Sequence, residues 1–373
     1  MDKIKKLLLF RIPMSICNFR CHYCYLSQRE VSFQGIQPQM KYTPEEFGQA
    51  MNLRRIGGLA YGNFCADGET LLVKDIDLYV KEFVKQGHYA EVVTNLTISK
   101  VLDRFLAWDS ELLHHVEFKC SFHYLELKKH GLLELFAHNV KRIWTAGGSA
   151  NIEVTPSDEL IPYLDELKEF SMREFGSLPH ITIARDDRTK TIDYLTNLTI
   201  DEYDSIWSQF HSTFWDYKKT IFGVRQSSFC YAGKWSLYIN LCDGTAQPCY
   251  FGRILGDVFA NPEAPLPESP VGKCILAHCY NGHMLMTLGL IPNATDVGYG
   301  DIRDRLCSDG SHWLQPELKA FFNTKCAESN QELSTNEKIL HLTKSRLKFF
   351  FTFPNLVVKK MLRDGKKIFK KYT

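Results

Sequence analysis

Short apolar runs typical of strands alternate with amphipathic segments typical of helices through the first half of this 373-residue chain. The expected strands are residues 7–16, 59–64, 89–94, 115–122, 151–155 and 180–184, and the expected helices are 43–56, 74–86, 99–108, 128–145 and 157–175. Strands that alternate with helices favour a parallel sheet with right-handed crossovers. The pattern predicts an α/β fold, a partial (β/α)6 barrel or an open sheet, with its functional site at the carboxyl ends of the strands.

Composition narrows the class of protein. Hydrophobic residues make up 45% of the chain, charged residues 24%, and the net charge is +2. These values are typical of a folded globular protein, and no compact basic and aromatic patch indicates nucleic-acid binding. The apolar run 7–10 is too short for a signal peptide, and no apolar stretch approaches ~20 residues. We therefore expect a cytoplasmic protein, in which clustered cysteines bind metal or react more often than they form disulfides.

Three of the 12 cysteines follow the first expected strand with the spacing Cys-x-x-x-Cys-x-x-Cys: Cys17, Cys21 and Cys24. Thiolates are soft ligands for iron–sulfur clusters, zinc or copper(I), and three within eight residues converge on one small object. Three ligands leave one corner of a [4Fe–4S] cube open, which suits a site that binds a further molecule. The spacing predicts a metal centre at the carboxyl end of the sheet.

The second half of the chain has a different organisation. A polar segment precedes a helix expected at 201–214. Strands expected at 235–240 and 246–251 flank Asp243-Gly244, a hairpin turn signal. A loop rich in proline precedes a helix expected at 277–290. We predict a core at 1–190, a bridging segment at 191–224, a Cys-rich β-hairpin plus helix module at 225–310, and a helical basic amphipathic tail at 311–373.

From residue 338 onward lysines and arginines are interleaved with apolar residues, the only acid after Glu337 is Asp364, and Pro354 splits the segment. A basic amphipathic segment binds anionic membranes or acidic partners, so peripheral contact with the inner face of the membrane is one expectation. A solvated surface helix that packs on the domain is the alternative.

Three stretches together resemble the radical S-adenosylmethionine (SAM) superfamily: CNFRCHYCY after the first strand, CADGETL after the second and VVTN after the third. The resemblance implies that Cys17, Cys21 and Cys24 hold a [4Fe–4S] cluster whose open iron binds SAM. Such enzymes reduce SAM to a 5′-deoxyadenosyl radical, with electrons from a partner such as flavodoxin or ferredoxin. Tyr23 would then lie against the adenine.

The resemblance also implies a set of SAM contacts at the ends of later strands. Asp67, Gly68 and Glu69 occupy the place of the family's Gly-Gly-Glu turn, which meets the methionine amino group. Asp67 departs from that pattern, although Asp tolerates a left-handed backbone and Glu69 can still accept from an ammonium group. The remaining expected contacts are Thr94, Asn95 and Ser121. For Thr94 and Ser121 the alternative is a hydroxyl at a strand end that bonds only to local partners.

The Cys-rich module resembles the SPASM and twitch extensions of the same superfamily, through Cys230, Gly244 and Cys249. Cys274 and Cys279 would complete a four-thiolate site for a second, auxiliary [4Fe–4S] cluster. A single such cluster, the twitch arrangement, is favoured because the dense further run of Cys in SPASM is missing. Zinc is the alternative metal. Alternative ligands are Cys242, His278 and His283. Later thiols expected to be incidental are Cys307 and Cys326.

The resemblance predicts removal of a hydrogen atom from a substrate, as an oxidoreductase-like or epimerase-like reaction on a sugar or glycan. The basic tail favours a substrate at a membrane surface, for example a lipid-linked or polymeric glycan. In an epimerisation Cys65 or Cys120, at expected strand ends, would return a hydrogen atom, although packing is the more common role of such thiols. A peptide- or protein-modifying enzyme is an alternative. It is less favoured, because the expected barrel starts near residue 1 and no peptide-recognition domain is expected before it. A non-catalytic metal-binding interaction protein is the alternative of another class.

Overall fold

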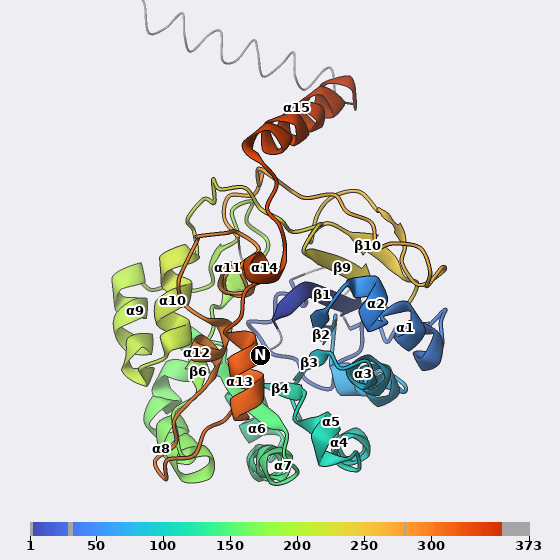
Figure 1. Cartoon of the computed structure of the whole chain (residues 1–373). Helices are drawn as coiled ribbons and strands as arrows, with labels where there is room; N and C mark the ends of the chain where they lie inside the picture. The colour runs from blue at the N-terminus through green and yellow to red at the C-terminus, as the bar shows by residue number, and fades with distance from the viewer. Residues whose placement is uncertain (1–2, 29–32, 280, 353–373) are drawn as a thin grey trace, which may run out of the picture.

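The computed structural model of the chain describes residues 3–28, 33–279 and 281–352 (Figure 1). One sheet has the strand order β11-β10-β9-β1-β2-β3-β4-β5-β6. The first six strands are β1 (Ile4–Ile12), β2 (Leu59–Ala66), β3 (Tyr89–Thr94), β4 (Val116–Ser121), β5 (Ser149–Val154) and β6 (His180–Ile181). They are parallel neighbours in sequence order, so the predicted parallel sheet is confirmed.

The sixth strand is shorter than the expected 180–184. After Ile181 the chain leaves the sheet, and Arg185–Asp186 (β7) pairs with Asp193–Tyr194 (β8) in a separate two-stranded sheet. Ala184 accepts a backbone hydrogen bond from Leu195 (3.0 Å), so its carbonyl serves this second pairing.

Helices follow the strands as expected, although several are divided. Their bounds are α1 (Pro44–Ala50), α2 (Leu53–Ile56), η1 (Thr70–Leu72), α3 (Ile76–Lys85), α4 (Ser99–Leu106), α5 (Ser110–Leu113), α6 (Tyr124–Lys129), α7 (Leu133–Thr145), η2 (Asp158–Tyr163), α8 (Leu164–Phe175), α9 (Ile200–Trp207), η3 (Ser208–Phe210), α10 (Thr213–Ile221), α11 (Gly282–Thr287), α12 (Tyr299–Arg303), α13 (Pro316–Phe322), α14 (Cys326–Ser329) and α15 (Thr335–Thr352). The expected helix 128–145 breaks at Gly131, whose φ of 66° favours glycine. The expected helix 277–290 is reduced to α11.

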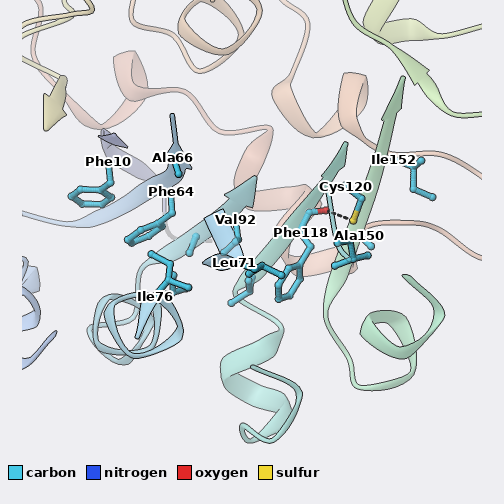
Figure 2. Packing of buried hydrophobic residues seen from close by; sticks show 14 of the residues in the cluster. Phe10, Phe64, Ala66, Leu71, Ile76, Val92, Phe118, Cys120, Ala150 and Ile152 are labelled. Carbon is cyan, nitrogen blue, oxygen red and sulfur yellow. Dashed lines mark hydrogen bonds between the residues drawn. The ribbon is translucent and has the colours of Figure 1, made fainter. Parts of the chain in front are cut away.

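Alternate residues of each strand pack against the helices of the first half. Figure 2 shows this layer, in which Phe10, Phe64, Val92 and Phe118 come from four neighbouring strands. All four side chains are fully buried, and burial of that much apolar surface is the main term that stabilises the sheet. The intervening residues of the same strands point to the inner side of the curved sheet.

The second half of the chain both extends the sheet and covers its inner side. β9 (Ser236–Asn240) lies beside β1 in parallel, β10 (Thr245–Gln247) pairs with it in antiparallel fashion, and β11 (Gly256–Asp257) ends the sheet. Helices α12, α13 and α14 pack on the inner face (Figure 1), with the rings of Phe322 and Tyr61 4.6 Å apart. Residues from 311 to 329 are therefore part of the packed fold.

Helix α15 extends away from the body of the molecule (Figure 1). Its first turns lie on the Cys-rich half, where the Lys338 ammonium is 5.7 Å from the ring centroid of Tyr231. Residues 353–373 of the expected amphipathic tail lie outside the described residues. Within the described part of the chain, no helix combines the length and the apolar character needed to cross a membrane.

Candidate functional site

A cavity of about 280 Å³ opens at the carboxyl ends of the parallel strands. The three thiols Cys17, Cys21 and Cys24 line it, together with residues from β2, β3 and β4, residues that directly follow β5 and β6, and residues from helices α10 and α11. Its volume is close to the lower end of the range for ligand pockets, ~300–1,000 Å³. The structure thus brings the predicted triad to the predicted edge of the sheet, beside space for a small molecule.

The loop that carries the triad is held by the turn that follows β2. The Glu69 N–H donates to the Ile16 carbonyl (3.0 Å), and the Asp67 N–H donates to the Ile12 carbonyl (3.0 Å). A Cβ atom at Gly68 would collide with the Ile16 carbonyl oxygen. Glycine is therefore required at position 68 because two backbone segments approach closely there.

Burial raises the pKa of the Cys17 thiol to about 11, and it raises the pKa of Cys21 further. The thiols also raise one another's pKa, since each would place a negative charge near the next. A positively charged group between them would reverse both effects. Within the described residues no three or more His, Cys, Asp or Glu side chains are grouped tightly enough for one metal ion. The set is all sulfur, which is the donor type that iron–sulfur clusters take, with each thiolate on a different iron atom.

Glu69 is buried in the cavity wall, with 2% of its surface exposed. One carboxylate oxygen, Oε1, accepts from the Thr94 hydroxyl (2.5 Å) and the Leu71 N–H (2.9 Å), and Oε2 accepts from the Asn95 N–H (2.8 Å). Burial nevertheless raises the pKa of Glu69 above its usual value. Two carboxylate oxygens accept about four hydrogen bonds, so Oε2 retains room for one more donor.

The other expected SAM contacts have different positions. Thr94, Asn95 and Ser121 all line the cavity. The Thr94 hydroxyl is engaged by Glu69 and by the Leu96 N–H (2.8 Å), so it orients the carboxylate. The Asn95 amide donates to Asn18 Oδ1 (2.8 Å) and so joins the end of β3 to the triad loop.

Asp67 does not line the cavity. It accepts from Arg11 Nε of β1 (2.9 Å) and from a second guanidinium nitrogen, and its φ lies outside the left-handed region. The tolerance of Asp for a left-handed backbone is therefore not what allows this residue at the turn. Asp67 instead forms an ion pair that joins the ends of neighbouring strands.

Tyr23 lines the cavity, and its hydroxyl shares a hydrogen bond of 2.7 Å with Nδ1 of His123. Burial lowers the pKa of His123 to about 4, so its ring is neutral near pH 7. His123 immediately precedes α6 and also lines the cavity. The sequence analysis missed it, because a single histidine two residues beyond Ser121 carries no spacing signal.

The two thiols expected at strand ends lie on opposite sides of the sheet. Cys65 lines the cavity, and burial raises its pKa to about 12, so it keeps its proton near pH 7. Cys120 lies in the outer hydrophobic layer, where its Sγ contacts the Phe118 carbonyl oxygen (3.4 Å; Figure 2). Side chains alternate along a strand, so Lys119 and Ser121 face the cavity and Cys120 between them does not. The expectation that Cys120 faces the site is wrong.

The inner wall of the cavity carries several cations that the sequence analysis did not single out: Lys119 of β4, Arg185 of β7 and Lys218 of α10. Burial lowers the pKa of Lys119 and, more strongly, that of Lys218. His283 of α11 lies on the same wall, and its pKa is lowered by burial and then by these three cations. Ordinary helix and loop positions hide such residues in a sequence, because only the fold brings them together.

Below the cavity, fully buried Arg303 of α12 meets three carboxylates of the inner sheet face. It pairs with Glu117 (3.0 Å), with Glu91 (3.7 Å) and with Glu153. Burial raises the pKa of Glu117 to about 7, although Arg303 opposes the shift. This network of buried charges lies next to the cavity, since Glu91 is one of its members and also lines the cavity.

The four thiols expected to form the second site also come together. Cys230, Cys249, Cys274 and Cys279 line a separate cavity of about 20 Å³. Two backbone hydrogen bonds between Cys230 and Gly272 (2.8 and 2.9 Å) bring the first of them beside the loop of the third. Burial raises the pKa of Cys230 to about 11 and that of Cys249 to about 12. The set is again all sulfur, the donor type that iron–sulfur clusters and zinc take.

The alternative ligands lie elsewhere. Cys242 packs in the outer hydrophobic layer, His278 is within hydrogen-bond distance of the Thr191 carbonyl (2.9 Å), and His283 lines the larger cavity. None of the three lines the small cavity. Cys307 and Cys326 are buried away from both cavities, as expected for incidental thiols.

Comparison with known proteins gives similarity of fold. No family model and no curated protein sequence matches the chain. Streptococcus suis SuiB bound to S-adenosylmethionine matches with 12% identity and a TM-score of 0.44, covering 70% of this chain and 63% of SuiB. Native anSMEcpe with bound AdoMet matches with 15% identity and a TM-score of 0.49, covering 70% and 80%.

BtrN in complex with AdoMet and 2-DOIA matches with 15% identity and a TM-score of 0.38, covering 69% of this chain and 80% of BtrN. The chain thus spans just under two thirds of the length of SuiB and four fifths of the other two. All three proteins have been solved with this ligand bound. The similarity is one of the arrangement of helices and strands, and it assigns no function to this chain.

Proposed function

We propose that the chain is a radical SAM enzyme. The observation that carries the proposal is that three thiols and one buried carboxylate line the same cavity at the carboxyl edge of a parallel sheet. Cys17, Cys21 and Cys24 would hold a [4Fe–4S] cluster with one open iron. SAM bound there would supply a 5′-deoxyadenosyl radical when the cluster is reduced, with flavodoxin or ferredoxin as the electron donor.

The chain's own residues would bind and orient SAM. Glu69 Oε2 has room for a further donor, which suits the methionine ammonium group, and Thr94 and Asn95 hold the carboxylate in place. A charge-assisted hydrogen bond of this kind contributes roughly 1.5–3 kcal/mol. Tyr23 and His123 form the wall where the resemblance places the adenine, and the neutral His123 ring avoids a charge beside it.

The four later thiols would hold a second [4Fe–4S] cluster in a twitch-like module. Two features support this proposal: the sulfur-only set around the small cavity, and the fact that Tyr250 and Asn281 line both cavities. A cluster bound by these thiols would be linked to the reaction cavity through Tyr250 and Asn281. Zinc at this site is distinguished by iron analysis.

The substrate reaction would begin with loss of a hydrogen atom from a substrate carbon, on a sugar or glycan type of molecule. In an oxidation, one electron and one proton then leave the substrate radical, the electron going to the second cluster. In an epimerisation, the S–H bond of Cys65 would break, a new C–H bond would form on the substrate, and the Cys65 thiyl radical would regain one electron from the second cluster, resupplied by the reducing partner, and one proton from water. Cys65 supports the second route because it lines the cavity as a protonated thiol.

The C-terminal segment is proposed to bring the enzyme to the inner face of the membrane through its basic residues. A sedimentation assay with vesicles of phosphatidylserine and phosphatidylcholine tests this: the full chain should co-sediment at low salt and lose binding at high salt. No binding at any salt concentration would remove the membrane proposal and leave the catalytic one unaffected.

The experiment that tests the enzyme proposal is SAM cleavage. Protein purified without oxygen and reconstituted with iron and sulfide should form 5′-deoxyadenosine when dithionite and SAM are added, as measured by mass spectrometry. A variant with Ala at Cys17, Cys21 and Cys24 should form none, and Cys307→Ala, a buried thiol remote from both cavities, is the matched control. Bound iron without any 5′-deoxyadenosine would favour a metal-binding interaction protein.

A further inference from the structure

Several basic side chains gather on one wall of the reaction cavity. Lys218 and His283 come from helices α10 and α11, and Lys119 and Arg185 come from the sheet side. All four line the cavity that contains the triad, although 98 residues separate Lys119 from Lys218 in the sequence. Such a gathering of cationic and cation-capable groups in a cavity attracts anions.

Lys218 is the centre of this wall. Only 7% of its surface is exposed, and its Nζ donates to the Thr182 hydroxyl at 2.8 Å. In the part of the chain that the structure describes, Lys218 forms no ion pair: one of its three N–H donors goes to the neutral Thr182 hydroxyl, and its Nζ lies 4.9 Å from the centroid of the Phe214 ring. A buried ammonium group without a counter-charge is costly, and its pKa is correspondingly lowered by burial and by the nearby cations Lys119 and Arg185.

His283 provides a second, independent observation. It is 4% exposed and lies 4.9 Å from the ring of Phe214, yet among the described residues neither of its ring nitrogens has a hydrogen-bond partner. Buried polar groups in folded proteins are normally hydrogen-bonded. A histidine whose two nitrogens are both unsatisfied and which lines a cavity is prepared for a ligand in that cavity.

Carboxylates pair with two of the basic groups on this wall, Lys119 and Arg185. Glu153 pairs with Lys119 (3.2 Å) and Arg303, and Asp187 pairs with Arg185 (2.8 Å). Glu91, which also lines the cavity, accepts from the hydroxyls of Tyr61 (2.9 Å) and Tyr299 (3.1 Å) and lies near Arg303. These contacts leave Lys218 and His283 as the groups on this wall with donors to offer.

We propose that the substrate carries an oxyanion, a phosphate or carboxylate group, which Lys218 and His283 bind. The inference rests on the proposed function, because it takes this cavity as the place where the substrate meets the radical. It narrows the substrate class to an anionic small molecule, such as a sugar that bears a phosphate or an acid group. The cavity of about 280 Å³ has room for one such unit.

Anion binding can be measured before the substrate is known. The probes are inorganic phosphate and acetate, with chloride at the same ionic strength as reference, added to the reconstituted full-length protein without oxygen. The thermal midpoint is followed by tryptophan fluorescence, because a ligand that binds the folded state raises it with saturation. The wild type should respond to phosphate or acetate beyond the chloride reference, and the more effective of the two identifies the kind of oxyanion.

The variants compare two adjacent lysines. Lys218→Met should weaken the anion response about 10- to 100-fold, the change expected when a charged hydrogen bond is lost, and Lys218→Arg should restore part of it. Lys219→Met is the matched control, since Lys219 lies one residue away and pairs with Asp204 (2.9 Å) outside the cavity. Lys218→Met should fold at least as well as the wild type, because it removes a buried charge without an ion-pair partner.

Three results would overturn the inference. The first is a wild type that responds to phosphate and acetate no more than to chloride, and the second is an equal response in wild type and Lys218→Met. The third is a Lys218→Met variant that loses SAM affinity and keeps its anion response, which would assign the lysine to the SAM carboxylate. Formation of 5′-deoxyadenosine by wild type and Lys219→Met, measured in parallel, decides the proposed function separately from the anion result.

Discussion

The two groups of thiols differ most in the space beside them. Both groups combine buried and partly exposed thiols, but the first borders a cavity of about 280 Å³ and the second borders one of about 20 Å³. The first group has three thiols and the second has four. A cluster on the first would therefore have both an open iron and room for a ligand, and a cluster on the second would have neither.

The two groups are also assembled differently. The triad comes from eight consecutive residues, positioned by the backbone contact between Ile16 and the Gly68-Glu69 turn. The four later thiols are spread over 50 residues and are gathered by pairing between distant loops, such as Cys230 with Gly272. This difference suggests that the triad is a binding site for a reacting molecule and that the second set is an enclosed centre, and the following predictions test that contrast.

The largest effect is expected from the triad. Replacement of Cys17, Cys21 and Cys24 by Ala should lower 5′-deoxyadenosine formation by more than about 1,000-fold, because no thiolate remains to hold the reducing cluster. Iron analysis should fall from about eight to about four per chain. Substantial SAM cleavage in this variant would show that the reaction takes place elsewhere.

A smaller effect is expected from the carboxylate beside the triad. Glu69→Gln keeps the shape of the side chain and removes its charge, so SAM affinity should fall about 10- to 100-fold while iron content stays unchanged. Equilibrium binding of SAM to the oxidised protein measures this. The control is Glu166→Gln, a surface carboxylate that pairs with Lys128 (2.6 Å). Unaltered SAM affinity in Glu69→Gln would remove Glu69 from the binding site.

Chelation should separate the two centres by rate. The cavity beside the triad is about 280 Å³ and the one beside the later thiols about 20 Å³, so a chelator should remove about half of the iron in a fast phase and the rest about tenfold more slowly. Added SAM should slow the fast phase only. A single phase for all the iron, or protection of the slow phase by SAM, would contradict the assignment of the open site to the triad.

The smallest effect on SAM cleavage is expected from the second set of thiols. Cys230→Ala combined with Cys249→Ala should remove about four irons and leave 5′-deoxyadenosine formation within about twofold of the wild type. Turnover of the substrate, once it is identified, should be lost. A large drop in SAM cleavage would mean that the two centres depend on each other.

The sequence predicts the parts of the site that are local in the chain. The spacing of Cys17, Cys21 and Cys24, the turn at Gly68 and the strands that precede them all follow from short patterns, and the structure brings the triad and Glu69 together as expected. The orientation of Cys120 was missed because a strand end predicts a position and not a face. One residue of offset moves a side chain to the other side of the sheet.

Features that depend on distant pairing were not predictable. Strand β9 lies beside β1 although 223 residues separate Ile12 from Ser236, and Arg303 of a five-residue helix pairs with Glu117 of β4. Lys218 and His283 belong to different helices, and each has an ordinary neighbourhood in the sequence. Such contacts are set by the packing of the whole chain, whereas local periodicity reports only on single elements.

The contrast between the two groups of thiols is tested most directly by electron paramagnetic resonance of the reduced protein with and without SAM. In the Cys230→Ala, Cys249→Ala variant, where only the triad would hold a cluster, SAM should change the spectrum. In the triad variant, where only the later thiols would hold one, SAM should leave the spectrum unchanged. A spectrum that responds to SAM in the triad variant, or fails to respond in the other, would contradict the account.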